Sequence, residues 1–257
     1  MNFTFALEQF ELFVLILIRL ASFVFAAPFF NMANVPRKVK AGFALCLTVL
    51  VYSLFPDMTV EYNGMIDYAI IVVEEMIVGI LLGAVTSFCV QIIMFAGKII
   101  DMDIGISMAQ LYDPTTRMQV GIMGNLYYYM MMLLLIISGM HQYLVAAIVE
   151  TYKVIPIGGV KFGVGIYTAI ISFISDFFVI GFRIALPVFS AILMLNCVLA
   201  ILAKVSPQMN MFVVGMQLKI FVGIFVILFT ISMLPSVSDF ILDEIERLFA
   251  MLVRGMS

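Results

Sequence analysis

The sequence predicts an all-α integral membrane protein, and three observations lead to this fold class. Of the 257 residues, 65% are hydrophobic and only 11% are charged, whereas ordinary soluble domains are about 45–50% apolar and about 25% charged. The mean hydropathy is +1.20. The apolar residues gather into runs of roughly 20, which is the helix length that crosses the hydrocarbon core of a bilayer. No internal repeat and no Pro/Ser-rich linker divides the chain, so one helical unit is the simplest organisation.

The first part of the chain contains three apolar runs separated by short polar breaks. The first run contains Arg19, and the second is short for a full crossing of a bilayer. The third run contains the adjacent acids Glu74 and Glu75. The runs cover residues 10–30, 41–55 and 69–96, and the first break, residues 31–40, carries three basic residues.

The middle of the chain begins with a polar stretch, residues 97–116, which we interpret as a connector. A fourth apolar run covers residues 121–137 and continues to about residue 149, and residues 152–165 form a Gly/Pro/Lys-rich connector. The next run, residues 166–203, is too long for one crossing and contains Pro187. Because proline removes a backbone donor in mid-helix, we expect either two helices or one strongly kinked helix.

The end of the chain is predicted to form a polar turn over residues 204–219 and an apolar helix over residues 220–234, closed by Pro235. Residues 236–254 then form an amphipathic helix on a membrane surface or against a partner. Ser238 is the expected N-cap, and Asp243 lies one turn before Arg247. The apolar face of this helix consists of Ile241, Ile245, Leu248 and Leu252.

Five charged residues lie inside apolar runs: Arg19, Glu74, Glu75, Asp176 and Arg183. Each would cost about 2.5–3.5 kcal/mol at the centre of a lipid-exposed helix. Glu74 and Glu75 are adjacent and point about 100° apart around a helix, so they do not form one paired-carboxylate site. Asp176 and Arg183 stand roughly 10 Å apart along a helix, so they do not simply neutralise each other. Three explanations remain open: structural ion pairs or residues near helix ends, an ion pathway, and packing against other subunits.

The sequence does not predict a catalytic site, a metal-binding site or a cofactor-binding site. His141 is the single histidine, and the three cysteines lie in separate apolar runs without metal-ligand spacing. The 13 basic residues are spread along the chain, which does not suggest a nucleic-acid-binding surface. The sequence therefore indicates neither an enzyme nor a nucleic-acid-binding protein.

Three segments together resemble the FliR family of flagellar type III export-gate proteins. They cover residues 19–49, 74–116 and 184–220, and they include the runs AGKIIDMDIGISMAQLYDPTT (residues 96–116) and SPQMNMFVVG (residues 206–215). The resemblance extends from about residue 10 to residue 235. Asp103 stands where the family pattern has Gln, and Gln217 stands where Pro is common.

The resemblance implies a non-enzymatic subunit of the flagellar protein export gate. With FliP-like and FliQ-like subunits it would form the channel for unfolded export substrates, and it would contact an FlhB-like protein and membrane lipid. The resemblance implies that the protein is located in the bacterial inner membrane at the flagellar basal body. The implied organisation is a FliP-like part over about residues 1–180, a FliQ-like hairpin over about 181–235 and an amphipathic C-terminal helix over 236–257.

The resemblance also implies roles for two polar segments. A loop from about Gly105 to Met118 would enter the channel as a plug, and a second segment would form the turn of the FliQ-like hairpin. The plug residues would be Gly105, Ile106, Ser107, Met108, Ala109, Tyr112, Asp113, Pro114 and Thr115. The turn residues would be Lys204, Ser206, Pro207, Gln208, Asn210 and Lys219.

Two alternatives to a flagellar gate subunit remain open on the sequence. One is the homologous gate subunit of virulence type III secretion, which differs little in sequence. The other is a small ion-coupled transporter that uses the four charges Glu74, Glu75, Asp176 and Arg183. A transporter of this kind is expected to show inverted-repeat symmetry between its halves, and none is visible in the sequence.

Overall fold

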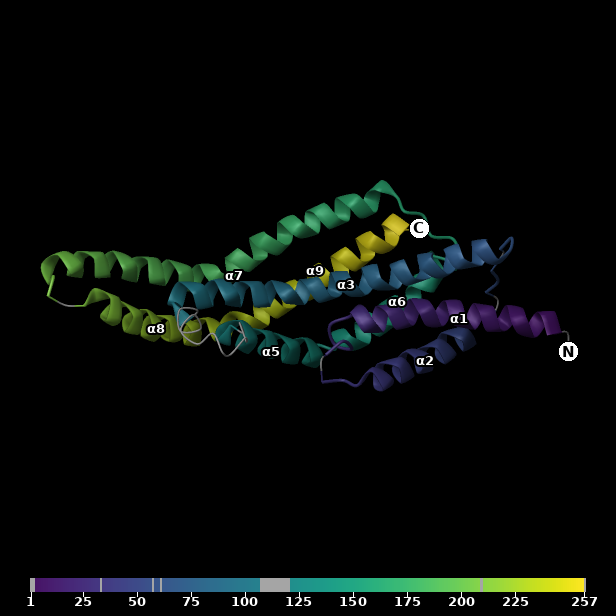
Figure 1. Cartoon of the computed structure of the whole chain (residues 1–257), viewed down its shortest axis with the longest axis horizontal. Helices are drawn as coiled ribbons and strands as arrows, with labels where there is room; N and C mark the ends of the chain where they lie inside the picture. The colour runs from purple at the N-terminus through teal and green to yellow at the C-terminus, as the bar shows by residue number, and fades with distance from the viewer. Residues whose placement is uncertain are drawn as a thin grey trace. The chain divides into compact units, whose positions relative to one another are not determined.

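The computed structural model describes residues 3–32, 34–56, 58–60, 62–106, 121–208 and 210–256, and these residues form α-helices and connections without a β-strand. This confirms the predicted all-α class. The helices are α1 (Phe3–Ala26), α2 (Arg37–Leu54), α3 (Met65–Ile104), α5 (Ile122–Ile137), α6 (Met140–Val154), α7 (Val164–Val205), α8 (Met211–Thr230) and α9 (Leu234–Met256), with a 3-10 turn at Ile231–Met233 between the last two (Figure 1).

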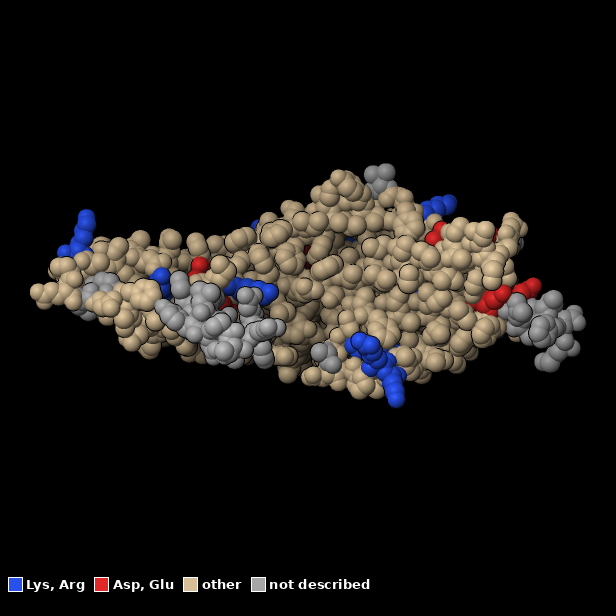
Figure 2. Space-filling model, viewed as in Figure 1, with Lys and Arg blue, Asp and Glu red and all other residues tan. Residues whose placement is uncertain are grey.

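Several helices are long and apolar enough to cross a membrane. Within the described residues there are four such helices, or five if the bent pair α5 and α6 forms one span. With 40 residues, α3 is about 60 Å long. Even tilted by 40°, it would cover about 46 Å along the bilayer normal, compared with a hydrocarbon core of about 30 Å. Figure 2 shows a face on which most of the described surface carries neither basic nor acidic side chains.

The chain divides into two compact units, each assembled from separate segments. Unit 1 contains Met1–Cys89, Ser138–Phe173 and Asp243–Ser257, and unit 2 contains Val90–Ile137 and Ile174–Leu242. Unit 1 therefore holds α1, α2, α6 and the first part of α3. Unit 2 holds α5, α8 and the second part of α7. Three helices, α3, α7 and α9, contribute residues to both units.

In unit 1, α1 lies beside α2 (Figure 1) and packs closely against α3. A Cβ atom added at Gly79 would lie 2.3 Å from the carbonyl oxygen of Arg19, and one added at Gly83 would lie 2.9 Å from that of Phe23. Glycine is required at such approaches because any side chain would separate the two backbones. The two glycines, one turn apart, thus bring the middle of α1 against α3.

The connection from α2 to α3 is also held against α1. The Tyr62 hydroxyl donates a hydrogen bond of 2.5 Å to a carboxylate oxygen of Glu11, and the Tyr68 hydroxyl donates to the Glu11 carbonyl at 3.4 Å. The hydrogen bond to Glu11 raises the pKa of the Tyr62 phenol. Both contacts place the start of α3 beside the first half of α1.

The fourth apolar run does not form one helix. Gly139 adopts a left-handed backbone with φ 78°, and α5 ends before this residue while α6 begins after it. A residue with a Cβ atom rarely adopts this conformation, so glycine determines where the run breaks. The apolar run over residues 121–149 is therefore divided between two helices, α5 and α6.

Helix α3 continues eight residues beyond its predicted end at Ala96. Ile100 and Ile104 are buried, and they extend the buried face of α3 formed by Ile93 and Ala96. The helical spacing of these apolar residues overrides the polar composition of residues 97–104. Residues 97–104 of the stretch interpreted as a connector are therefore helix.

In unit 2, the second part of α7 and α8 form a helical hairpin (Figure 1). The Asn210 side chain accepts a hydrogen bond from the backbone N–H of Phe212 at 3.2 Å and so caps α8. A Cβ atom added at Gly215 would lie 3.3 Å from the Leu199 side chain, which places α8 against α7. The turn is shorter than predicted, because Lys204 lies in the last turn of α7 and Lys219 lies within α8.

The long run after the second connector forms one helix, α7, which has 42 residues and contains Pro187. This is the single-helix alternative of the two that the sequence left open. The helix is about 63 Å long.

The predicted ends of the last two helices were partly wrong. Pro235 does not close α8; it lies in the first turn of α9, where the missing N–H costs no hydrogen bond. Ser238 is inside α9 and not at its N-cap, and its hydroxyl is buried without a hydrogen-bond partner among the described residues. Arg247 pairs with Glu244 at 2.7 Å. The predicted apolar face is buried within the chain, with Ile241, Ile245, Leu248 and Leu252 at most 1% exposed.

Candidate functional site: a buried charge pair and the helix corner at Asp101

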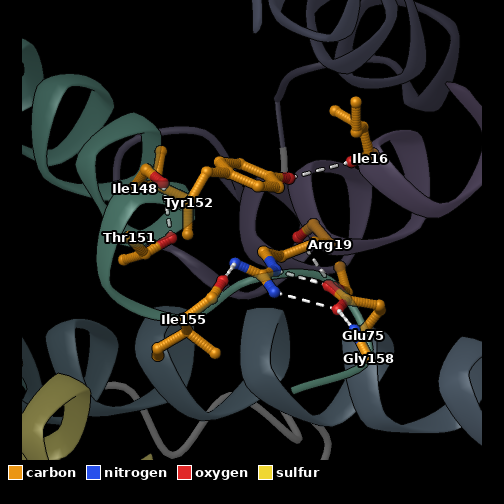
Figure 3. Close-up of polar contacts among 9 residues, drawn as sticks. Ile16, Arg19, Glu75, Ile148, Thr151, Tyr152, Ile155 and Gly158 are labelled. Atoms are coloured by element: carbon orange, nitrogen blue, oxygen red, sulfur yellow. Dashed lines mark hydrogen bonds and ion pairs between the residues drawn. The ribbon is translucent and has the colours of Figure 1, made fainter. Parts of the chain in front are cut away.

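Two of the five predicted intramembrane charges meet inside unit 1. Arg19 on α1 and Glu75 on α3 are both fully buried. The guanidinium donates through Nη2 to Oε1 of Glu75 at 2.9 Å and through Nε to Oε2 (Figure 3). This two-point geometry is the strongest arrangement for an arginine–carboxylate pair.

The remaining polar atoms of the pair also have partners. Nη1 of Arg19 donates to the Ile155 carbonyl at 3.1 Å, and the Gly158 N–H donates to Glu75 at 3.3 Å. The guanidinium lies 4.4 Å from the ring centroid of Tyr152, whose hydroxyl donates to the Ile16 carbonyl at 3.2 Å (Figure 3). A buried ion pair is tolerated only with such additional hydrogen bonds, since both charges have lost their water.

Arg19 and Glu75 therefore neutralise each other within this chain, and neither needs a charged partner from a neighbouring subunit. It links α1, α3, α6 and the connector after α6 at one point, which is a structural role. Tyr152, which the sequence analysis assigned to a connector, lies in α6 and is 3% exposed. Its place beside Arg19 could not be found from sequence, because 133 residues separate the two along the chain.

The structure does not bring the other three charges into this cluster. Glu74 points away from Glu75 around α3 and is half-buried. Asp176 is half-buried and Arg183 is exposed, and both lie on α7, where about two helical turns separate them. Arg183 lines a cavity in unit 2.

A second polar cluster, in unit 2, was missed by the sequence analysis. Asp101 is 1% exposed, and its carboxylate accepts hydrogen bonds from the backbone N–H groups of Met123 at 3.1 Å and Gly124 at 3.3 Å. These N–H groups lie in the first turn of α5 and have no partner within that helix, so Asp101 on α3 caps α5. A Cβ atom added at Gly97 would lie 2.2 Å from Cα of Gly124, so the backbones of α3 and α5 touch.

The predicted plug loop begins directly after this corner. Gly105, with φ 88°, ends α3, and Ile106 follows it. The other predicted plug residues lie outside the described residues, namely Ser107, Met108, Ala109, Tyr112, Asp113, Pro114 and Thr115. Asp101 thus joins α3, which precedes this segment, to α5, which follows it.

Asp103, the residue that departs from the family pattern, lines a cavity of about 240 Å³ together with Lys219. One of its carboxylate oxygens is buried without a hydrogen-bond partner among the described residues. The cavity thus has one acidic and one basic residue in its lining. Within the part of the chain that is described, no group of three or more His, Cys, Asp or Glu side chains could hold a metal ion.

Long apolar helices, a buried arginine–glutamate pair and a buried aspartate that joins α3 to α5 define an all-α membrane protein. A family described as "Bacterial export proteins, family 1" matches residues 10–245. Because this is most of the chain, the protein belongs to that family, and its relatives place it in the FliR family.

Three relatives illustrate the match. The chain is 27% identical over 235 residues to the flagellar biosynthetic protein FliR of Escherichia coli (strain K12), covering 91% of this chain and 89% of that protein. It is 29% identical over 238 residues to FliR of Bacillus subtilis (strain 168), covering 89% of each chain. Identity to FliR of Aquifex aeolicus (strain VF5) is 24% over 216 residues, covering 84% of this chain and 83% of that protein. The resemblance seen in the sequence is confirmed, and the chain is a membrane protein of flagellar biosynthesis.

Proposed function

We propose that this chain is a subunit of the flagellar type III protein export gate, located in the bacterial inner membrane at the flagellar basal body. With FliP-like and FliQ-like subunits it forms the channel through which unfolded flagellar substrates leave the cell, and an FlhB-like protein contacts it. The observation that carries this proposal is the family match over residues 10–245, together with relatives named flagellar biosynthetic proteins.

The lengths of the helices support a place in a larger assembly. Both α3 and α7 exceed the thickness of the hydrocarbon core by about a factor of two. The hairpin of α7 and α8 exposes many large apolar side chains, and such surfaces are covered in a membrane protein by lipid or by other subunits. Examples are Met194 at 71%, Ile201 at 65%, Phe221 at 72% and Phe229 at 68% exposed.

The segment after α3 is proposed to act as the channel plug, from about Gly105 to Met118. The hydrogen bonds of Asp101 support this role, because they join α3, which precedes the segment, to α5, which follows it. We expect that deletion of residues 106–111 leaves assembly intact and makes the membrane conduct small ions, measured as current across planar bilayers. An unchanged conductance in the deletion variant would refute the plug role.

The ion-coupled transporter is the less well supported alternative. Glu75, one of its four proposed groups, already binds Arg19 through both carboxylate oxygens and is fully buried. We propose a non-enzymatic channel subunit, with the energy for export supplied elsewhere in the apparatus. The virulence gate subunit is less favoured because the relatives carry flagellar names.

The proposal is tested by purifying the tagged full-length chain from native membranes and identifying the proteins that remain bound. FliP-like and FliQ-like subunits are expected in the eluate, and their absence under mild detergent would refute the proposal. Glu74→Gln is expected to weaken this association, because Glu74 is half-buried and does not take part in the Arg19–Glu75 pair. Glu246→Gln is the matched control, since Glu246 is exposed on α9.

A further inference from the structure

A cavity in unit 2 combines apolar walls with one cation. It has a volume of about 230 Å³ and lies between α5, α7 and the beginning of α9. Ile180, Ile184 and Val237 form part of its walls, and Arg183 is the one charged residue among those that line it. Arg183 forms no hydrogen bond or ion pair with any other described residue.

The other polar groups of the cavity are already satisfied or neutral. The Tyr127 hydroxyl lies 3.2 Å from Oγ1 of Thr230, which itself donates to the Ile227 carbonyl at 3.1 Å. Pro187, which also lines the cavity, has no N–H to offer the carbonyl of Arg183 one turn earlier. The cavity therefore presents a cation without a counter-ion beside a predominantly apolar space.

The position of Arg183 on α7 is that of a residue at the lipid headgroups. Residues 184–203 contain no charged side chain, and these 20 residues are bounded by Arg183 and Lys204. A helix of this length spans about 30 Å, which is the thickness of the hydrocarbon core. Two other charged residues of unit 2, Asp103 on α3 and Lys219 on α8, line a different cavity together.

The lining of the cavity decides between kinds of occupant. Water is a poor occupant of an apolar space because it needs two to four polar partners. An acyl chain is thin and apolar, and a phosphate group at its head would supply the missing anion for Arg183.

We propose that this cavity binds an anionic phospholipid, with the headgroup phosphate at the Arg183 guanidinium and part of one acyl chain between α7 and α9. Arginine suits this role because its planar donors match phosphate oxygens. Basic pockets between membrane helices bind anionic headgroups in this manner. Phe240, 45% exposed at the lining of the cavity, provides an apolar surface for the chain.

The test uses the full-length chain, purified in mild detergent with whatever subunits remain bound to it. Binding of phosphatidylglycerol and of phosphatidylcholine is measured by native mass spectrometry over a concentration series. Arg183→Gln removes the cation, Arg183→Lys retains it, and Lys204→Gln removes an equal charge from the other end of the same segment. Helix content by circular dichroism establishes that each variant is folded.

Phosphatidylglycerol is expected to bind more tightly than phosphatidylcholine. Arg183→Gln should weaken the binding of phosphatidylglycerol about tenfold or more, since a hydrogen bond to a charged group is lost. Lys204→Gln should change this binding little. Arg183→Lys should recover part of the binding lost in Arg183→Gln. Equal effects of the two glutamine variants would refute a specific site. Competition by millimolar inorganic phosphate would refute a lipid as the ligand. Loss of a bound subunit without loss of lipid in Arg183→Gln would instead assign Arg183 to a partner's carboxylate.

Discussion

Substitution of either member of the Arg19–Glu75 pair should destabilise the protein strongly, whereas replacement of both should cost less than the two single changes together. In Arg19→Leu, the Glu75 carboxylate stays fully buried and retains the Gly158 N–H as its donor. In Glu75→Leu, the guanidinium retains the Ile155 carbonyl and the Tyr152 ring. Each single variant thus leaves an uncompensated charge inside unit 1.

The magnitude follows from the burial and the hydrogen bonds of the pair. Leaving one buried charge unpaired costs about 3–5 kcal/mol. The double variant Arg19→Leu/Glu75→Leu removes both charges and leaves one backbone carbonyl and one backbone N–H without their side-chain partners, at about 1–3 kcal/mol each. The two single losses sum to about 6–10 kcal/mol and the double variant loses about 2–6 kcal/mol, so the midpoints of these ranges give a coupling free energy of about 4 kcal/mol.

The assay is thermal unfolding in detergent, followed by the helical circular dichroism signal, because the chain contains no tryptophan for fluorescence. For a chain of this size, a loss of 3–5 kcal/mol lowers Tm by about 6–20 °C. Glu74→Gln is the matched control for Glu75→Gln, since the two residues are adjacent and only Glu75 contacts Arg19. A coupling free energy below about 1 kcal/mol, or equal shifts for the two glutamine variants, would refute the structural role of the pair.

Two further predictions concern the corner between α3 and α5. Asp101→Ala should destabilise the protein by about 1–2 kcal/mol through loss of the cap on α5, and Asp101→Asn, which keeps one acceptor, should lose less; an equal loss in both would contradict the capping role. Gly97→Ala should lower Tm, since its Cβ atom would lie 2.2 Å from Cα of Gly124. Gly42→Ala, on α2 with no atom within 4 Å, should raise Tm slightly because alanine favours helix. Shifts of Tm in the same direction for Gly97→Ala and Gly42→Ala would contradict the close packing of α3 against α5.

The fold class and most helices could be predicted because apolar content and run length depend only on composition and local sequence. The errors occurred where a single residue or a distant partner decides the structure. Gly139 breaks an otherwise uninterrupted apolar run through its left-handed backbone. Ser238 has the residue type of a cap but lies inside α9, because Pro235 is compatible with the first turn of a helix as well as with the end of one.

The sequence could predict which charged residues need partners, but not which residues those partners are. The sequence showed that Arg19 and Glu75 need partners, but 56 residues separate them, and periodicity within one helix carries no information on contacts between helices. Asp101 looked like part of a polar connector, and its capping role depends on the approach of α5. The spacing of Ile93, Ala96, Ile100 and Ile104 was a signal that could have revealed the extra two turns of α3.

The separation of Arg19 and Glu75 along the chain has a consequence for biosynthesis. At about 5–20 residues per second, the ribosome needs about 3–11 s to extend the chain by the 56 positions from Arg19 to Glu75. During this interval α1 exists with its arginine and without the acid that neutralises it. Integration of α1 into lipid at that stage carries a cost of about 2.5–3.5 kcal/mol, which disappears once α3 arrives. The first helix therefore gains its full stability in the membrane only together with the third.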